Sequence, residues 1–308
     1  MDAATRVQIA GLVFTVILPV TAVAGVALVG RRLWPRAASS GALLGVALLV
    51  GLVAVWLGIA GAPDLSDAKH QAVLAGVLAA LLGLALDAVP GLRGKVPLVA
   101  LAAGLPLALG LWRTAARFPG LWEEGPAVAL ASKAWLLDAG VVGLVAWLLT
   151  DHAARRAPTP AALGPLALAC AGAAGVAVFS HSALVGQLFG GLGLATGAAA
   201  LLGWWKADLR PGHAAVAGVM ATFSTLLVYA HLSTDAPRAA STLLLLAPAG
   251  GLAALLVRRT LPGILLAAGL TAIPVAAAAL LTQARFAEDQ PADGGGSAEP
   301  DYGSLGNY

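Results

Sequence analysis

The stretch Ala183–Trp205, ALVGQLFGGLGLATGAAALLGWW, decides the fold class. It carries no charged side chain, and it exceeds the ~20 apolar residues that an α-helix needs to cross the hydrocarbon core of a bilayer. The whole chain has the same character, with 59% hydrophobic and 11% charged residues, whereas soluble domains have about 25% charged residues. We therefore expect an integral membrane protein.

Comparable apolar runs recur along the sequence and predict an all-α, polytopic bundle of about ten transmembrane helices. The expected spans are roughly 8–30, 40–62, 71–91, 96–112, 127–149, 160–180, 183–205, 213–231, 240–257 and 261–283. Residues 1–286 then form the transmembrane domain. Residues 287–308 are acidic and rich in Gly and Pro, a composition that cannot bury enough apolar area to fold by itself.

Basic residues favour one alternate set of loops, and this bias predicts the orientation. The favoured set carries Arg31, Arg32, Arg36, Arg93, Lys95, Arg155, Arg156, Lys206, Arg210, Arg258 and Arg259, whereas the other set and both termini carry Arg6, Lys69, Arg113, Arg117, Arg238 and Arg285. Because cytoplasmic loops carry the excess of Lys and Arg, both termini are predicted to be extracytoplasmic. These loop residues also explain the formal charge of +3, so the expected partner is the lipid bilayer and not nucleic acid.

Span five contains two ionisable residues, Lys133 and Asp138, in the stretch SKAWLLDAG. Lys133 is near enough to the outer end to extend toward water. Asp138 lies near the middle of the span, where a charge costs at least ~2.5–3.5 kcal/mol and usually faces the bundle interior or a water-filled cavity. Asp138 is therefore either a proton or cation site, or a hydrogen-bonded residue that holds two helices together. Asp87, near the cytoplasmic end of span three, is interpreted as a helix-end residue within reach of the interface.

Breaks and polar groups in three further spans mark a candidate transport path. Pro106 in span four and Pro248 in span nine interrupt the backbone at corresponding places of the two five-span halves, which is typical of transporter binding sites. Span eight adds Thr222, Ser224 and Thr225 at mid-depth. These hydroxyls either line the path or bond back to their own helix.

Glycines in span seven predict a close helix contact. Gly186 and Gly190 form one G-x-x-x-G motif, and Gly193 and Gly197 form another on much the same face. Small residues at this spacing let helix backbones approach closely in lipid. The partner is predicted to be another span or another subunit.

The sequence contains no motif that indicates an enzyme or a cofactor site. There is no Walker loop, G-x-S-x-G or H-E-x-x-H motif, so no cofactor and no catalytic residue is expected. A metal site built from His70, His181 and His231 stays open, although the lack of a close ligand pair favours ordinary interfacial histidines. The single cysteine, Cys170, excludes an intramolecular disulfide.

Two segments resemble a known group of proteins. The segments FSHSALVGQLFGGLGLATGAAALLGWW and YAHLSTDAPRAASTLLLLAPAGG are similar to uncharacterised multi-span membrane proteins of planctomycetes and related bacteria. The resemblance covers spans six to nine. It implies a location in the bacterial cytoplasmic (inner) membrane and supplies no activity.

Two functions from different classes follow from these features. The first is a permease for a small solute, coupled to protons or cations through Asp138. The second is a non-catalytic subunit of a larger membrane assembly. In that case the tail would dock on neighbouring subunits, with the aromatic residues Tyr302 and Tyr308 as anchors, and the glycine face of span seven would offer a second contact.

Overall fold

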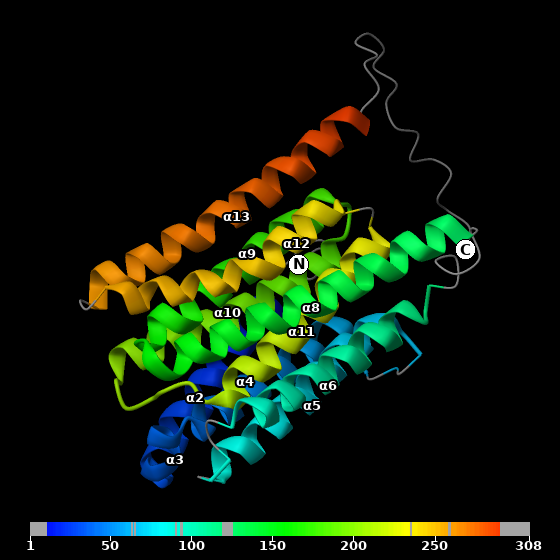
Figure 1. Cartoon of the computed structure of the whole chain (residues 1–308). Helices are drawn as coiled ribbons and strands as arrows, with labels where there is room; N and C mark the ends of the chain where they lie inside the picture. Colours follow the sequence, from blue (N-terminus) through cyan, green and yellow to red (C-terminus); the bar gives the residue numbers. More distant parts are fainter. Residues whose placement is uncertain are drawn as a thin grey trace, which may run out of the picture.

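The computed structural model describes residues 11–62, 64, 66–89, 91–92, 95–118, 126–234, 236–257 and 260–289. All regular structure in these ranges is helical, and no strand occurs among them (Figure 1). Ten helical segments are long and apolar enough to cross a membrane. The prediction of an all-α polytopic bundle with about ten spans is therefore confirmed.

The spans follow one another along the chain with short connections. Their bounds are η1 Val13–Ile17 with α2 Leu18–Leu33, α4 Ala42–Val55 with η2 Trp56–Ala60, α5 Ala68–Ala88, α6 Val96–Ala115, α8 Pro126–Arg156, α9 Thr159–Phe179, α10 Ala183–Trp205, α11 His213–Ser233, α12 Arg238–Leu246 with η3 Ala247–Leu256, and α13 Thr260–Asp289. A short helix, α3 Pro35–Ser40, lies between α2 and α4. The fifth span differs most from the prediction, because its helix continues beyond residue 149 to Arg156.

Local chemistry explains where several helices begin. Asp67 precedes α5 and its carboxylate accepts a hydrogen bond from the Lys69 amide, while the Ser182 hydroxyl accepts one from the Val185 amide at the start of α10. Such side chains satisfy amides that have no partner within the helix. Helix α9 begins with proline at its first turn, where the missing N–H is not needed.

Helix α11 lies at the centre of the bundle and packs most closely against α5. In its apolar window, 83% of the residues are buried, compared with 17% in α13. Glycines make the α5–α11 contact close: a Cβ at Gly83 would lie 2.5 Å from the Ala214 Cα, and one at Gly218 would lie 2.9 Å from the Ala80 Cβ. Small residues therefore bring these two backbones together, as is usual for helices in lipid.

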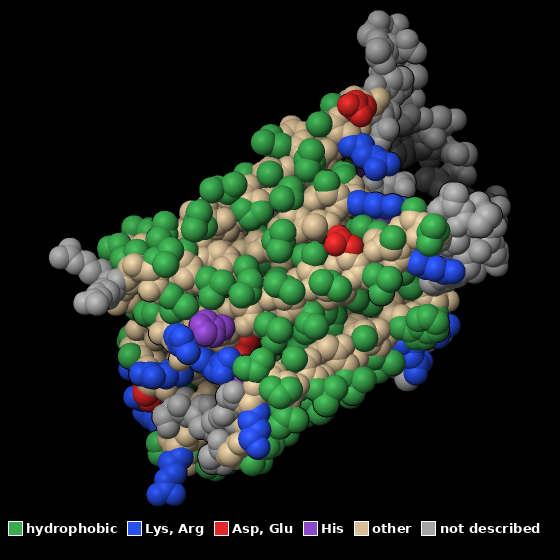
Figure 2. Space-filling view, in the orientation of Figure 1, with side chains coloured by type: hydrophobic (Ala, Val, Ile, Leu, Met, Phe, Trp, Pro, Cys, Tyr) green, Lys and Arg blue, Asp and Glu red, His purple; other side chains and the backbone are tan. Residues whose placement is uncertain are grey.

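The flank of the bundle is apolar and its two ends are charged. Figure 2 shows hydrophobic side chains spread over the long flank, with Lys and Arg gathered toward both ends. We call the end that carries Arg31, Arg155 and Lys206 the basic end, and the other end the opposite end. The side chains at the basic end belong to the loop set predicted to be cytoplasmic.

The glycine face of α10 packs within the chain. A Cβ at Gly186 or Gly193 would lie 3.2 Å from a backbone carbonyl oxygen of α9, and one at Gly197 would lie 3.8 Å from the Ala167 Cβ. Gly190 faces the Thr15 methyl group of η1 at 3.7 Å. The partners of this face are therefore spans six and one.

The two proline-containing spans differ in how the backbone responds. Pro106 is buried inside α6, which continues as an α-helix on both sides. Pro248 lies near the start of η3, a ten-residue 3₁₀ segment. Runs of this length are uncommon and often mark a hinge or a strained segment. Corresponding helices of the two halves also have different neighbours among the described residues. Helix α11 contacts α4, α5, α6 and α8, whereas α5 contacts α4, η2, α6 and α11.

Candidate functional site

The strongest candidate site is a series of buried polar side chains along α11. It begins at the basic end with His213, passes Thr222, Ser224 and Thr225, and ends near His231. The three hydroxyl-bearing residues and His213 are at most 3% exposed. Since buried polar groups are costly without partners, the partner of each one indicates what it does.

At the basic end, Asp87 of α5 caps the first turn of α11. Its Oδ1 accepts a hydrogen bond from the His213 amide at 3.0 Å, and its Oδ2 accepts one from the Ala214 amide at 3.1 Å. A carboxylate at a helix N-terminus is stabilised by these donors and by the helix dipole. Gly212 is required beside it, because a Cβ there would lie 2.3 Å from the Asp87 Oδ2.

This geometry corrects one interpretation made from the sequence. Asp87 was expected to reach the membrane interface at the end of its own helix, but its side chain is only 2% exposed. It serves the N-terminus of a different helix, 126 residues further along the chain. Sequence spacing gives no information about such a long-range cap.

A second carboxylate at the basic end pairs with histidine. Asp151 of α8 places its Oδ1 2.8 Å from the His213 Nδ1, and its Oδ2 lies 3.0 Å from an Arg155 guanidinium nitrogen. Asp151 is 1% exposed and His213 is 3% exposed, whereas Arg155 reaches the surface. The His213 Nε2 is buried without a hydrogen-bond partner among the described residues. A carboxylate partner at Nδ1 fixes the orientation of the imidazole ring.

In the middle of α11, the hydroxyl groups divide into two kinds. The Thr222 hydroxyl donates to the Gly218 carbonyl at 2.9 Å, which is the ordinary back-bonding of threonine in a helix. Ser224 Oγ and Thr225 Oγ1 are buried with no hydrogen-bond partner among the described residues, as is Thr114 Oγ1 on α6. Since most buried polar side-chain atoms have a partner, unpartnered hydroxyls in a bundle interior are candidates for a functional role.

Glycines on the neighbouring helices let their backbones approach these hydroxyls closely. A Cβ at Gly143 of α8 would lie 3.3 Å from the Ser224 Oγ, and one at Gly110 of α6 would lie 2.8 Å from the Thr225 Oγ1. The two hydroxyls therefore face α8 and α6 across positions that lack side chains. This arrangement places polar atoms between helices in the centre of the bundle.

At the opposite end, the series finishes in an aromatic pair. The rings of Trp135 on α8 and His231 on α11 have centroids 4.2 Å apart. The His231 Nδ1 lies 2.6 Å from the Ala236 carbonyl oxygen, which fixes the ring orientation. The Trp135 Nε1 is buried with no acceptor among the described residues. Trp135 thus packs inward, which explains why this tryptophan lies inside its span.

The three histidines considered as metal ligands have separate surroundings. His70 contacts the Trp56 indole nitrogen, and the His181 ring lies 5.2 Å from the Phe286 ring. Within the described part of the chain, no three His, Cys, Asp or Glu side chains come close enough to hold a metal ion. The His231 Nδ1–H instead donates to the Ala236 carbonyl oxygen in the segment that follows α11.

Asp138 and Lys133 lie on the outer surface of α8, apart from the polar series. Asp138 is exposed, and so are its neighbours Leu137 and Val141. The structure therefore differs from the expectation that Asp138 faces the bundle interior. A helix has interior-facing and lipid-facing positions at the same depth in the membrane. The sequence indicates the depth of Asp138 along its span, but not the face of the helix on which it lies.

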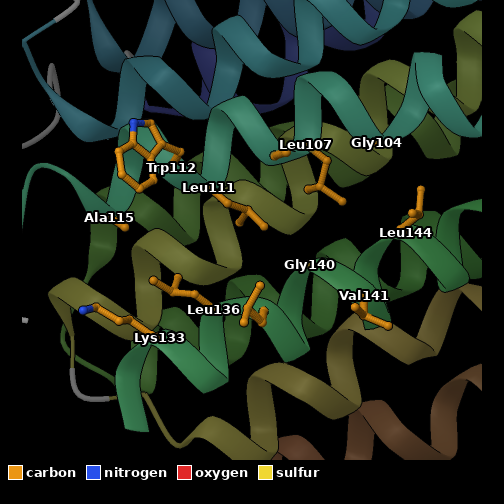
Figure 3. A pocket seen from close by; sticks show the side chains of 12 residues that line it. Gly104, Leu107, Leu111, Trp112, Ala115, Lys133, Leu136, Gly140, Val141 and Leu144 are labelled. Carbon is orange, nitrogen blue, oxygen red and sulfur yellow. The ribbon is translucent and has the colours of Figure 1, made fainter. Parts of the chain in front are cut away.

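Lys133 lines an apolar groove between α6 and α8 with a volume of about 550 Å³. Figure 3 shows Lys133 at one end of this groove, with Trp112 and Ala115 on the facing helix. The rest of the lining is apolar, so the groove provides little chemistry for a polar solute. Its composition fits a lipid chain or an apolar helix face.

Asp151 and His213 are the residues that sequence reasoning missed. Asp151 lies just beyond the predicted end of span five at residue 149, and His213 is the first residue of predicted span eight, so neither was singled out as a site residue. Asp151 belongs to the fifth span only when α8 is extended to Arg156. A signal was present in TDHAARR, where helix-forming residues continue past the apolar run. Comparison with family models, with curated proteins and with solved structures found no match to this chain.

Proposed function

We propose that this protein is a permease for a small solute, coupled to protons, with its path along α11. The observation that carries the proposal is a group of buried polar atoms that have no hydrogen-bond partner among the described residues, and it includes His213 Nε2, Ser224 Oγ, Thr225 Oγ1, Thr114 Oγ1 and Trp135 Nε1. They come from α6, α8 and α11, which contact one another. Polar residues inside a membrane domain commonly mark substrate and proton pathways.

The Asp151–His213 pair supplies the coupling in this proposal. Histidine exchanges protons readily near neutral pH, and the second carboxylate oxygen of Asp151 is held by Arg155. This assignment replaces Asp138 and Lys133, the coupling candidates of the sequence, because both are exposed on α8. Pro106 in α6 and the 3₁₀ segment after Pro248 are the positions at which the bundle would bend during transport.

The test uses the purified full-length chain in lipid vesicles loaded with the pH indicator pyranine. Amino acids, sugars, monocarboxylates and dicarboxylates are added as separate mixtures, and the internal pH is recorded. We expect one class to acidify the interior faster than in protein-free vesicles. The rate should fall at least tenfold in His213→Gln and in Ser224→Ala.

A matched control is Thr21→Val, because the Thr21 hydroxyl is exposed on α2 and bonds back to the Ile17 carbonyl at 2.8 Å. This variant should transport at the wild-type rate. Ser224→Ala removes an atom that has no hydrogen-bond partner among the described residues, so this variant should keep its fold even if His213→Gln is unstable. The proposal would be overturned if no class of solute acidified the vesicle interior faster than in protein-free vesicles.

A second candidate function rests on the exposure of Asp138. A carboxylate on the outer surface of a membrane span is expensive in lipid, and a neighbouring subunit would cover it. We therefore keep as a proposal that the chain is a non-catalytic subunit of a larger assembly in a bacterial inner membrane. The anchors predicted in the tail, Tyr302 and Tyr308, lie outside the described residues.

Copurification from native membranes tests this second function. The second function is supported if another protein copurifies with the wild-type chain in mild detergent and no longer copurifies with Asp138→Leu. A shortened chain without residues 290–308 shows whether the tail contributes. A wild-type chain that runs alone in mild detergent would contradict the idea.

A further inference from the structure

A hollow at the opposite end of the bundle has the composition of a binding site. Its volume is about 400 Å³, within the range of small-molecule pockets. Three segments that are distant in sequence form it: the turn between α9 and α10, the last turn of α11 with the residues after it, and the last turns of α13. It is separate from the buried series along α11 and from the lipid-facing groove.

The charged chemistry of this hollow is basic. Arg285 of α13 and His181 of the α9–α10 turn both line it, together with hydroxyl-bearing side chains such as Ser180 and Ser182. No carboxylate contributes to the lining within the described residues. Arginine presents a fork of N–H donors that matches the two oxygens of a carboxylate or a phosphate.

Several hydroxyls in the lining already donate to their own helix, which determines what they can offer. The Ser233 hydroxyl donates to the Tyr229 carbonyl and the Thr282 hydroxyl donates to the Ala278 carbonyl. Their oxygen lone pairs remain available as acceptors. The hollow thus combines a cationic donor with hydroxyl acceptors, and it suits a ligand that has one oxyanion and hydroxyl or amino groups nearby.

The backbone at His181 supports a role for its side chain. His181 has φ of 62°, and it is the one non-glycine residue with positive φ in the described ranges. The His181 amide donates to the Val178 carbonyl at 3.1 Å and the Ser182 amide donates to the Ala177 carbonyl at 2.9 Å. These bonds form a Schellman motif, in which glycine usually occupies this position.

A side chain in the left-handed conformation is disfavoured, and glycine would close the same turn without that cost. The backbone conformation alone therefore favours glycine over histidine at position 181. The ring lines the hollow, and its packing against the Phe286 ring holds it in place. Strained residues of this kind are concentrated at binding sites.

We infer that this hollow binds a small molecule or headgroup carrying a carboxylate or phosphate, with Arg285 and His181 as its donors. The oxyanion can belong to a free solute or to the headgroup of an anionic lipid, since the hollow opens at the end of the helices. Binding is independent of transport, so this inference stands or falls separately from the permease.

The test measures binding by isothermal titration of the full-length protein in nanodiscs of phosphatidylcholine. The probes are inorganic phosphate, lactate and glycerol 3-phosphate. We expect saturable binding, tightest for the probes that carry a hydroxyl group beside the oxyanion. Arg285→Gln should weaken it at least tenfold and leave the melting temperature unchanged, because Arg285 is exposed on α13.

His181→Asn separates the ring from the backbone, because asparagine tolerates the left-handed conformation. This variant should weaken binding several-fold and leave the melting temperature unchanged. Arg113→Gln is the matched control, since Arg113 is an exposed arginine near the same end that does not line the hollow. Equal losses of binding affinity in Arg113→Gln and Arg285→Gln would show that only the net charge of the protein matters, and this result would overturn the assignment.

Nanodiscs that contain phosphatidylglycerol distinguish the two sources. Competition of this lipid with glycerol 3-phosphate, lost in Arg285→Gln, identifies a headgroup as the ligand. Binding that is unchanged by the lipid identifies a free solute. The inference is wrong if no probe binds saturably in neutral discs and the protein shows no Arg285-dependent preference for the anionic lipid.

Discussion

Asp87 and Asp138 are both aspartates in membrane spans, and the bundle gives them opposite surroundings. Asp87 is 2% exposed and accepts two backbone hydrogen bonds at the N-terminus of α11. Asp138 lies at mid-span on the exposed surface of α8. The carboxylate nearer the helix end is the buried one. Depth along a span therefore does not determine burial, because the rotational face of the residue decides it.

The largest expected effect is that of Asp87→Ala. It leaves the His213 and Ala214 amides buried without an acceptor, and each such loss costs about 1–3 kcal/mol. We expect the free energy of unfolding to fall by roughly 2–5 kcal/mol, seen as a lower melting temperature in detergent. The matched variant Asp138→Ala should not lower it, because this side chain is exposed on a membrane span, where a carboxylate is costly. Equal melting temperatures for the two variants would contradict the contrast.

The second effect is the coupling between Asp151 and His213. A double-mutant cycle with Asp151→Asn, His213→Gln and the double variant isolates their interaction from other losses. Contacting buried residues typically show coupling energies of about 0.5–3 kcal/mol, and the 2.8 Å contact places this pair in that class. Additive changes in the free energy of unfolding would mean that the two side chains act independently.

The third effect concerns the hydroxyls in the middle of α11. Ser224→Ala and Thr225→Val remove atoms that have no partner among the described residues. Replacing an unpaired buried group by an apolar one is close to neutral or stabilising. We expect the melting temperature in detergent to stay level or rise, while transport falls. A loss of more than about 1 kcal/mol in the free energy of unfolding would reveal a bound water or another partner.

The number of spans was readable from the sequence because each apolar run must satisfy its own backbone within the bilayer. Hydropathy alone therefore predicted ten spans, and the described residues contain ten such helices. The neighbours of each helix were not readable. Thr222, Ser224 and Thr225 were predicted at mid-depth, but only the fold separates the back-bonded Thr222 from the two unpartnered hydroxyls.

The basic-end cluster was hidden for a related reason. Asp87, Asp151 and His213 come from α5, α8 and α11, and their contacts join residues 62 to 127 positions apart. Each residue alone resembles an ordinary interfacial group. Hydrophobic periodicity reports which segments are apolar, and it contains no term for a polar contact between distant helices.

The smallest expected effect is that of Asp208, a third carboxylate, which lies at the basic end in contact with water. Its Oδ2 accepts from the Arg31 Nε at 2.7 Å, with 45% of the Asp208 side chain and 37% of the Arg31 side chain exposed. This hydrogen bond from Arg31 holds the pKa of Asp208 below its ordinary value.

A lowered pKa in the folded state means that the pair stabilises the protein above the unfolded pKa of about 3.9 and loses that contribution as the pH falls through the lower folded value. Because both groups are exposed and screened, the contribution is about 0–1 kcal/mol. Asp208→Asn should therefore lower the melting temperature slightly at pH 7 and leave it unchanged in strong acid, and 0.5 M salt should reduce the difference at pH 7. The comparison between Asp87 and Asp138 assumes that exposure determines how much a carboxylate stabilises the fold. A decrease in melting temperature for Asp208→Asn as large as that for Asp87→Ala would contradict this assumption.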